Sequence, residues 1–258
     1  MPPLAAYTPP AQPVDQVTPP IPAPVPSPRS ESSGDGQSSS KGRPKIITQM
    51  AAPSAVPGLV AAYSFDEAEG PRVGDASGNG NAGYIGNASW SEGRFGSALQ
   101  FSGKDAMTIR ASQPLDATGE ITLQAWINPS QPQTDWRDVI TRENSNGAGA
   151  FSLPAASADG VPGEGWVVKE KFKLVPGRWS HLATTFDGRV QRLYFNGKLV
   201  AVRPHASKKI ESGALYIGGS PTWGNRFKGK IDEVRIYNRA LTGEEIRTDM
   251  NRPVLSSR

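Results

Sequence analysis

The stretch that decides the fold is Gly229-Lys230-Ile231-Asp232-Glu233-Val234-Arg235-Ile236-Tyr237, which has the pattern of a β-strand. Successive side chains of a strand point to opposite faces, so Val234 and Ile236 are expected in a core and Arg235 in water. Asp232 does not fit this pattern, because burial of a carboxylate is costly unless the group is paired or coordinated. A largely buried strand with one acid near its start therefore needs a partner for that acid.

A capping-box motif follows this stretch. Thr242-Gly243-Glu244-Glu245 places a threonine three residues before a glutamate, and the two side chains can satisfy backbone N–H groups at a helix start. The sequence therefore predicts a short C-terminal helix directly after Leu241.

The composition excludes several classes of protein. The chain has 258 residues, a net charge of +4, 28 glycines, 24 prolines and no cysteine. Abundant turn formers favour an all-β domain, a disordered segment or both. Without cysteine there are no disulfides, thiolate metal sites or cysteine nucleophiles. The basic residues are scattered, and no apolar run reaches the roughly 18 residues of a membrane helix, so neither a nucleic-acid partner nor a membrane span is expected.

The N-terminal part of the chain differs in composition from the rest. Residues 1–57 hold 14 of the 24 prolines together with many serines, which predicts a disordered Pro/Ser-rich linker. Residues 58–252 are predicted to form one domain, and 253–258 a short C-terminal tail. The first residues lack the basic and apolar segments of a signal peptide, so the sequence is expected to be cytoplasmic or an internal piece of a longer exported chain.

From residue 58 onward, short apolar runs alternate with turn signals, as in an all-β sandwich or barrel. Asn196-Gly197 between two such runs is a strong hairpin signal, because both positions of the turn need positive φ. The predicted strands are 59–65, 82–85, 97–101, 106–109, 121–127, 139–142, 150–153, 166–169, 179–186, 192–195, 198–202, 215–217 and 229–237. These strands predict one two-sheet antiparallel sandwich with a short C-terminal helix.

Several motifs in order along the chain resemble a bacterial laminin-G-like (concanavalin A-like lectin/glucanase) domain. They are Ala61-Ala62-Tyr63-Ser64-Phe65-Asp66-Glu67, the loop 75–83, 93–103, 121–127, 179–188, 193–197 and 231–241. The resemblance implies a jelly-roll fold, a secreted or cell-surface location, binding of carbohydrate or protein, and a structural calcium ion. The segment from Asn144 to Gly165 departs from the family pattern, and loops carry specificity on a sandwich, so the ligand's identity does not carry over.

A structural calcium site is predicted where the chain ends meet. The resemblance brings the strand ending at Asp66 beside the one beginning near Asp232, with the loop 75–81 close to both. Calcium prefers six to eight oxygen ligands, and the candidate ligands are Asp66, Asp75, Asn79, Asn81 and Asp232. The alternative is turn chemistry alone, with the loop side chains bonding to backbone and Asp232 paired with an arginine.

The carbohydrate site is predicted from aromatic and polar side chains in or beside loops. Sugars stack their C–H faces on aromatic rings, and neighbouring polar groups bond the hydroxyls. The candidates are Trp136, Arg142, Trp166, Trp223, Asn225 and Arg226. Trp90, Trp126 and Trp179 are expected to be structural.

Support for catalysis is weak. No strand carries the alternating acids of related jelly-roll hydrolases, and the adjacent Asp232 and Glu233 should point to opposite faces. His181 is expected in the core; the alternative is a lyase that uses His181, Tyr194 and Arg142.

The preferred function is therefore non-catalytic binding of a polysaccharide or glycan, as a module of an exported bacterial protein. The alternatives are a structural or adhesive module that binds protein and a polysaccharide-degrading hydrolase or lyase. The basic run Lys169-Glu170-Lys171-Phe172-Lys173, with Lys208-Lys209, is either a solvated face or a site for sulfated or acidic glycans.

Overall fold

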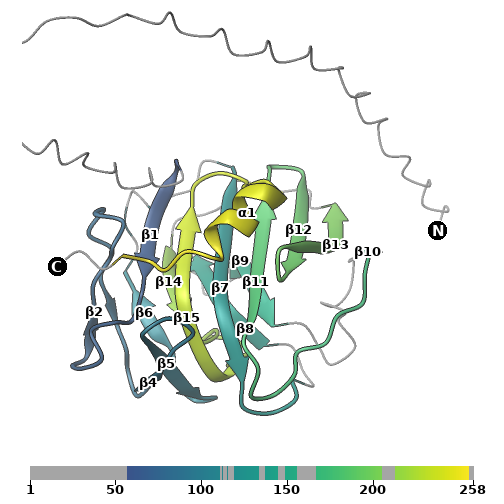
Figure 1. Ribbon diagram of the computed structural model, residues 1–258. Coiled ribbons are helices and arrows are strands. Elements are labelled where there is room, and N and C mark those ends of the chain that lie inside the picture. Colours follow the sequence, from purple (N-terminus) through teal and green to yellow (C-terminus); the bar gives the residue numbers. More distant parts are fainter. Residues whose placement is uncertain are drawn as a thin grey trace, which may run out of the picture. The chain divides into compact units, whose positions relative to one another are not determined.

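The structure is a computed structural model that describes residues 57–110, 112, 115, 119–133, 137–144, 149–155, 167–204 and 213–255. Residues 1–56 of the predicted linker and residues 256–258 lie outside these ranges. Within them the chain forms two antiparallel sheets and one short helix, α1 (Gly243–Asp249). The predicted all-β sandwich with a C-terminal helix is confirmed (Figure 1).

The larger sheet has nine strands, and two of its edge strands are short. Its order is β10 (Val167–Val168), β13 (Lys198–Pro204), β12 (Val190–Phe195), β11 (Ser180–Phe186), β7 (Ile121–Pro129), β15 (Lys228–Tyr237), β5 (Ser97–Ser102) and β4 (Ser89–Glu92), with β1 (Leu59–Tyr63) also paired to β15. The smaller sheet has six strands in the order β2 (Arg72–Val73), β3 (Gly83–Tyr84), β6 (Met107–Ile109), β14 (Gly213–Ile217), β8 (Arg137–Asn144) and β9 (Gly149–Ala155).

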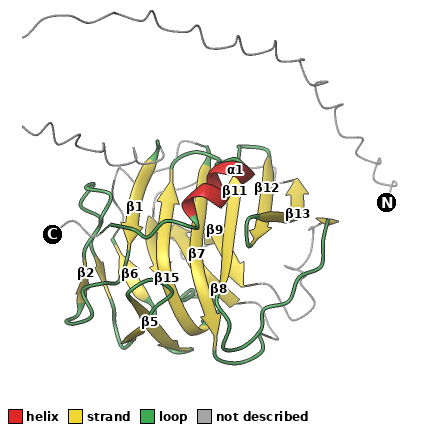
Figure 2. Cartoon of the chain, viewed as in Figure 1, coloured by secondary structure: helices red, strands yellow, loops and turns green. Residues whose placement is uncertain are grey.

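The main core lies between the two sheets. Leu123 and Leu182 of the larger sheet and Ile140 and Leu215 of the smaller one belong to the same cluster of buried apolar side chains. The outer face of the larger sheet is covered by α1, which crosses in front of its central strands (Figure 2). Ile246 of the helix packs there in a second apolar cluster, which includes Ala183, Tyr194, Tyr237 and Leu241.

Strand β15 joins the two ends of the domain. Along one edge it pairs with β7, and along the other it pairs first with β5, over 228–231, and then with β1, up to Tyr237. Between these two partners the strand contains a bulge, where Asp232 pairs with Trp126 but Arg235 pairs with Gln124. One extra residue is accommodated in the bulge, and Glu233 has a φ of +54°.

The helix begins with the expected capping box. The Thr242 hydroxyl accepts a hydrogen bond from the Glu245 N–H, and the Glu245 carboxylate accepts one from the Thr242 N–H. Most of the predicted strands are also present, whereas β2 and β4 were not anticipated, because Arg72-Val73 is very short and Ser89–Glu92 has no alternating apolar pattern.

The expectation that Arg235 stays in water is wrong. Arg235 is buried because the C-terminal segment packs over it, and its guanidinium donates to the Glu233 carboxylate at 3.0 Å and to the Arg252 carbonyl at 2.5 Å. The Val254 N–H donates to the same Glu233 carboxylate at 2.6 Å. Packing of the chain onto the sheet therefore continues beyond residue 252, through a buried ion pair that the bulge makes possible.

This pair leads to a stability prediction. Glu233→Ala leaves the buried Arg235 guanidinium with only the Asp249 carboxylate, 3.8 Å away, and removes the acceptor of the Val254 N–H. We therefore expect a loss of about 3 kcal/mol in the free energy of unfolding, measured by chemical denaturation. The control is Glu170→Ala, whose ion pair with Lys198 at 3.9 Å is more than half exposed on both sides and should contribute less than about 1 kcal/mol. Equal losses in both variants would contradict this account.

Candidate functional site: a polar sheet face beside an exposed tryptophan

The outer face of the smaller sheet carries a row of polar and aromatic side chains. Cross-strand pairing aligns Tyr84 with Thr108, Thr108 with Tyr216, Tyr216 with Thr141, and Thr141 with Ser152. The neighbouring row holds core residues such as Ile109 and Leu215, so the polar row points the other way, because side chains alternate along a strand. Tyr84 is exposed and Thr108 and Tyr216 are half-buried, whereas Thr141 on β8 is buried. The accessible part of the row therefore lies on β3, β6 and β14.

An exposed tryptophan lies in the loop that follows this face. Trp223, in the loop between β14 and β15, is 61% exposed. The turn that carries it is anchored to β8, because the hydroxyls of Ser220 and Thr222 donate to the two oxygens of the buried Glu143 carboxylate. The Ser220 hydroxyl also accepts from the Trp223 N–H at 2.8 Å. The exposed indole therefore extends from a turn that is held by two side-chain hydrogen bonds to Glu143 and by one hydrogen bond from its own backbone to Ser220.

A second buried acid on β8 supports the same loop. The Asp138 N–H donates to the Asn225 carbonyl at 2.9 Å, and the Asp138 carboxylate lies beside the side chains of Ser152, Asn225 and Thr141. Burial raises the pKa of Asp138 to about 6; these three polar side chains lower it and the charge of Glu143 raises it. The strand bulges between Asp138 and Ile140 and again between Arg142 and Glu143. Asp138 and Glu143 both hold the loop that carries Trp223.

The structure brings together only part of the predicted carbohydrate site. Trp223, Asn225 and Arg226 lie in one loop, where the Arg226 guanidinium donates to the Lys104 carbonyl at 2.6 Å. Arg142 pairs across β14 with the core residue Leu215, is buried and donates to the Leu115 carbonyl, so its side chain points into the sandwich. Trp136 and Trp166 lie outside the described residues.

Sequence reasoning missed the tyrosines of the polar row and the anchoring acid. The short runs around Tyr84 and Tyr216 were recognised as strands, but which of their faces points outward depends on cross-strand register. Nothing in the sequence around Glu143 indicates that it anchors a loop. Its hydrogen-bond donors, Ser220 and Thr222, are distant in the chain. Alternation of Tyr216 with Leu215 and Ile217 was the one available hint that this tyrosine faces away from the core.

The proposed calcium ligands fall into two groups that bond to different segments. In the first, the Asp75 carboxylate accepts from the N–H groups of Ala62, Ser77 and Asn81 and from the Ser77 hydroxyl. The side-chain amides of Asn79 and Asn81 donate to the Val60 carbonyl, at 3.2 and 2.8 Å. This carbonyl lies where β1 bulges against β15. These bonds are the turn chemistry considered as the alternative to a metal.

The second group consists of Asp66 and Asp232, which bind the two sides of one turn. One oxygen of Asp232 accepts from the N–H groups of Arg94 and Phe95, at 2.7 and 3.1 Å, and Asp66 accepts from the Ser97 N–H at 3.0 Å. Burial raises the pKa of Asp232 to about 7; the N–H groups of Phe95, Arg94 and Glu233 lower it, and the charge of Asp66 raises it. Two carboxylates with unfavourable mutual charge thus converge on this turn.

Of the two groups, only Asp66 and Asp232 show an unfavourable interaction between carboxylates that a cation would offset. A cation beside Asp66 and Asp232 would compensate the burial and the mutual repulsion that raise the pKa of Asp232. Across the described residues, no three acidic or histidine side chains converge as a metal centre. A calcium ion at this turn would therefore take its remaining ligands from oxygens other than carboxylates, which calcium accepts.

His181 cannot form a catalytic unit with the residues considered for a lyase. It is fully buried on β11, against Trp126 with ring centroids 5.4 Å apart, and burial lowers its pKa to about 3. Tyr194 packs in the cluster beneath α1, whereas Arg142 points into the core from the other sheet. A histidine that stays neutral and is sealed from solvent does not serve as a general base near neutral pH.

Comparison with known families agrees with this architecture. A family model described as the concanavalin A-like lectin/glucanases superfamily matches residues 101–247, more than half of the chain. The chain therefore belongs to this superfamily.

Two curated relatives are forms of the same protein, and this chain spans only a small part of each. The chain is 34% identical over 183 residues to pappalysin-1 of Homo sapiens, covering 59% of this chain and 11% of that protein. It is 38% identical over 82 residues to pappalysin-1 of Mus musculus, covering 30% of this chain and 5% of that protein.

Several solved structures share the fold at low sequence identity. Domain 4 of AbnA, a GH43 extracellular arabinanase from Geobacillus stearothermophilus in complex with arabinotriose, has a TM-score of 0.59 at 22% identity, covering 74% of this chain and 97% of that one. Trypanosoma rangeli sialidase in complex with sialic acid has a TM-score of 0.58 at 18% identity, covering 76% and 33%. These likenesses concern the fold alone.

The raised pKa of Asp232 gives a pH prediction. Between about pH 4 and 7 the unfolded chain ionises this group while the folded chain keeps it protonated, so ionisation destabilises the fold and stability should increase as the pH falls from 7 to 5. Glu233 and Asp138, whose pKa values burial raises to about 7 and about 6, act with the same sign. We expect Asp232→Asn to have a shallower slope of unfolding free energy against pH over this window in metal-free buffer.

The comparison variant for this measurement is Glu245→Gln. Its hydrogen bond with Arg239 lowers the pKa of Glu245 to about 2, so its contribution is lost only below about pH 4.5, outside the window. If Asp232→Asn has the same slope of unfolding free energy against pH as the wild-type chain, the pKa of Asp232 is not raised as described.

Proposed function

We propose that this chain contains a non-catalytic carbohydrate-binding domain that meets its glycan on the outer face of the smaller sheet. The observation that carries the proposal is the exposed indole of Trp223 on a turn anchored to Glu143, beside the row of Tyr84, Thr108 and Tyr216. Aromatic faces take the C–H faces of sugar rings, and the hydroxyls and the carboxamide of Asn225 supply hydrogen bonds to sugar hydroxyls. Membership of the lectin/glucanase superfamily supports this assignment.

A binding role fits these residues better than hydrolysis. Glycosidases need one carboxylate free to protonate the leaving group and a second as base or nucleophile. Both oxygens of Glu143 already hold the turn hydroxyls, and Asp138 is buried beside three polar side chains. The two acids of this face therefore act as supports for the loop.

The parent protein and its location are part of the same proposal. The solved arabinanase is described as extracellular and contains the related fold as its fourth domain. The structure has no helix, within the residues it describes, that is long and apolar enough to cross a membrane. We infer that this domain belongs to a longer secreted or cell-surface protein of bacterial origin, to which it brings a polysaccharide or glycan.

Calcium is proposed as a structural ion at the turn between β4 and β5. Asp66 and Asp232 would hold it, and the ion would supply positive charge against two carboxylates that otherwise repel each other. Its role is to fasten the end of β1 to the beginning of β5. The loop acids and amides at 75–81 are the less favoured part of the original ligand set. Asp75 is the one carboxylate among its three candidate ligands, and it already accepts hydrogen bonds from Ala62, Ser77 and Asn81.

Glycan binding is tested with Trp223 variants. We expect Trp223→Ala to reduce binding to immobilised polysaccharides and glycan arrays by about tenfold, because contact with an aromatic ring contributes about 0.5–1.5 kcal/mol beyond the burial of its apolar area. Trp223→Phe, which keeps a ring, should retain part of the affinity. Leu255→Ala, which removes another exposed apolar side chain, is the matched control and should bind normally. Absence of binding to any glycan by the intact chain would overturn the proposal and favour a protein-binding adhesive module.

The calcium proposal is tested by thermal unfolding. We expect added calcium to raise the melting temperature and chelation to lower it, and Asp232→Ala to abolish the difference. Asp75→Ala should lower the melting temperature while preserving the response to calcium. An identical melting curve with calcium and with chelator in the wild-type chain would rule the ion out.

A further inference from the structure

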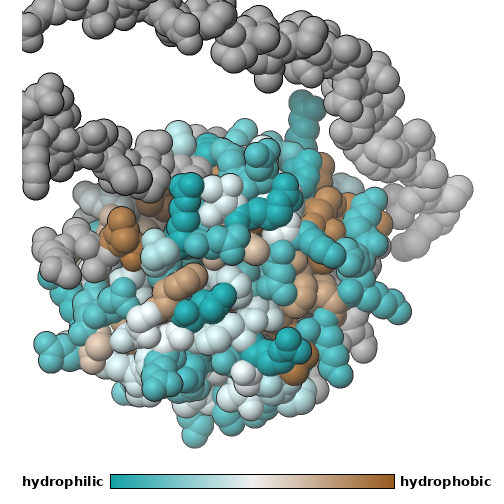
Figure 3. All heavy atoms as spheres, in the orientation of Figure 1, coloured by the Kyte–Doolittle hydropathy of each residue, from teal (hydrophilic) through white to brown (hydrophobic). Residues whose placement is uncertain are grey.

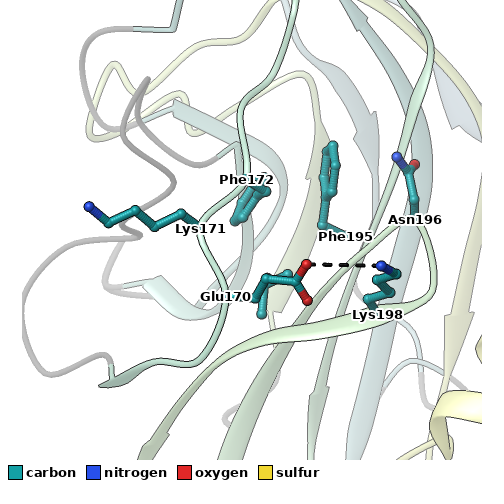
Figure 4. A pocket seen from close by; sticks show the side chains of 7 residues that line it. Glu170, Lys171, Phe172, Phe195, Asn196 and Lys198 are labelled. Atoms are coloured by element: carbon teal, nitrogen blue, oxygen red, sulfur yellow. Dashed lines mark ion pairs between the residues drawn. The ribbon is translucent and has the colours of Figure 1, made fainter.

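A pocket of about 230 Å³ opens at the edge of the larger sheet, apart from the residues assigned above. It is lined by Glu170, Lys171, Phe172, Phe195, Asn196, Lys198 and Val200 (Figure 4). These residues come from the segment after β10 and from the hairpin that joins β12 to β13. The volume is below the roughly 300–1,000 Å³ of sites for drug-sized ligands, which restricts an occupant to about one sugar ring or a short side chain.

The floor of the pocket is aromatic. The rings of Phe172 and Phe195 are stacked with their centroids 4.5 Å apart and an interplanar angle of 27°. Phe172 is buried and Phe195 is partly buried against the core, so the floor is anchored in the sandwich. Figure 3 shows hydrophobic side chains gathered toward the edge formed by β12, β13 and β10, where Val167 and Leu199 are exposed.

The rim of the pocket is polar and has an excess of positive charge. Glu170 and Lys198 face each other across the mouth, and Lys171 extends away from the aromatic pair (Figure 4). Two lysines, Lys171 and Lys198, thus line the pocket with one glutamate, and Lys169 and Lys173 lie nearby in the sequence. The Asn196 side chain accepts the His181 N–H at 2.8 Å, which fixes the turn at the end of the pocket.

The ion pair at the mouth is weak and replaceable. The Lys198 ammonium lies 3.9 Å from the Glu170 carboxylate, and the two side chains are 74% and 56% exposed. A solvent-exposed pair at this distance contributes less than about 1 kcal/mol. An anionic ligand can therefore take over Lys198 from Glu170 at little cost.

We propose that this pocket is a second ligand site and that it binds an acidic sugar, with the ring on Phe195 and its anionic group on Lys198. The occupant has to be apolar on one face, hydroxylated at the edge and negatively charged, and a pyranose bearing a carboxylate or a sulfate has all three properties. Glu170 then accepts hydrogen bonds from the ring hydroxyls. The site shares no residue with the outer face of the smaller sheet, so it does not depend on the function proposed for that face.

An acidic peptide fits the pocket less well. A peptide would satisfy the lysines, but it would present no extended C–H face to the aromatic floor and no hydroxyls to Glu170. Charge alone would then determine binding, and the phenylalanine floor would contribute little.

The proposal predicts opposite effects for the two members of the ion pair. With the full chain and isothermal titration calorimetry, the probes are oligogalacturonate for the carboxylate source, a heparin oligosaccharide for the sulfate source, a neutral xylo-oligosaccharide and polyglutamate. We expect at least one acidic sugar to bind, Glu170→Gln to increase its affinity about two- to fivefold, and Lys198→Gln to decrease it about tenfold. Phe195→Leu, which keeps an apolar floor without the ring, should also weaken binding several-fold.

Three controls separate this site from the rest of the molecule. Lys228→Gln and Leu255→Ala each change an exposed side chain outside the pocket and should leave the affinity unchanged. Melting curves establish that each variant is folded. Failure of both acidic sugars to bind, affinities unaffected by the three pocket variants, or polyglutamate binding that depends on Lys198 but not on Phe195 would each overturn the proposal.

Discussion

The buried carboxylate of Asp232, in the bulge of β15, is the constraint on which the rest of the structure depends. Strand β15 is longer than β5 or β1, and these two strands pair one after the other along the same edge of it. The pairing is interrupted between β5 and β1, at Asp232 and Glu233. The bulge turns Asp232 toward the β4–β5 turn, where it accepts two backbone N–H groups, and turns Glu233 toward the C-terminal segment. One local irregularity thereby fastens the beginning, the middle and the end of the domain to a single strand.

This arrangement also determines which surfaces are available for ligands. Glu233 and Arg235 hold the C-terminal segment, and with α1 it covers the outer face of the larger sheet. The outer row of the smaller sheet carries Tyr84 and Tyr216, and the loop that enters β15 carries Trp223. The aromatic and hydroxyl groups suited to a sugar therefore lie on the smaller sheet, whereas the C-terminal segment and α1 are fastened to the larger one. The pocket at Phe195 lies at an edge of the larger sheet, between the β12–β13 hairpin and the segment after β10.

Much of the fold could be predicted from the sequence, because the interactions that fix it are local. Alternation in Ile121–Ile127, the Asn196-Gly197 turn and the capping box at Thr242 each specify a conformation within a few residues. The exposure of Arg235 could not be predicted by alternation, because alternation says which face a side chain is on but not what covers that face. Similarly, Arg142 was placed near the ligand because of its neighbours in sequence, whereas its partner across β14 is a core leucine.

The candidate site was only partly predictable for the same reason. Trp223 was found because an aromatic residue in a Gly-rich loop is conspicuous, but the acid that anchors its loop is on another strand, 79 residues from Thr222. The family resemblance predicted a single set of calcium ligands. The hydrogen bonds divide these residues into a group that bonds to β1 and a pair, Asp66 and Asp232, at the β4–β5 turn.

The central claim is that a glycan binds the outer face of the smaller sheet around Trp223. Nuclear magnetic resonance titration of the full chain with arabinotriose and a panel of neutral oligosaccharides tests it most directly, by following the indole N–H of Trp223 and the ring resonances of Tyr84 and Tyr216. The account predicts saturable shifts at these three residues with at least one sugar while resonances of α1 stay fixed. Shifts confined to α1 and the C-terminal segment, or none with any sugar, would contradict it.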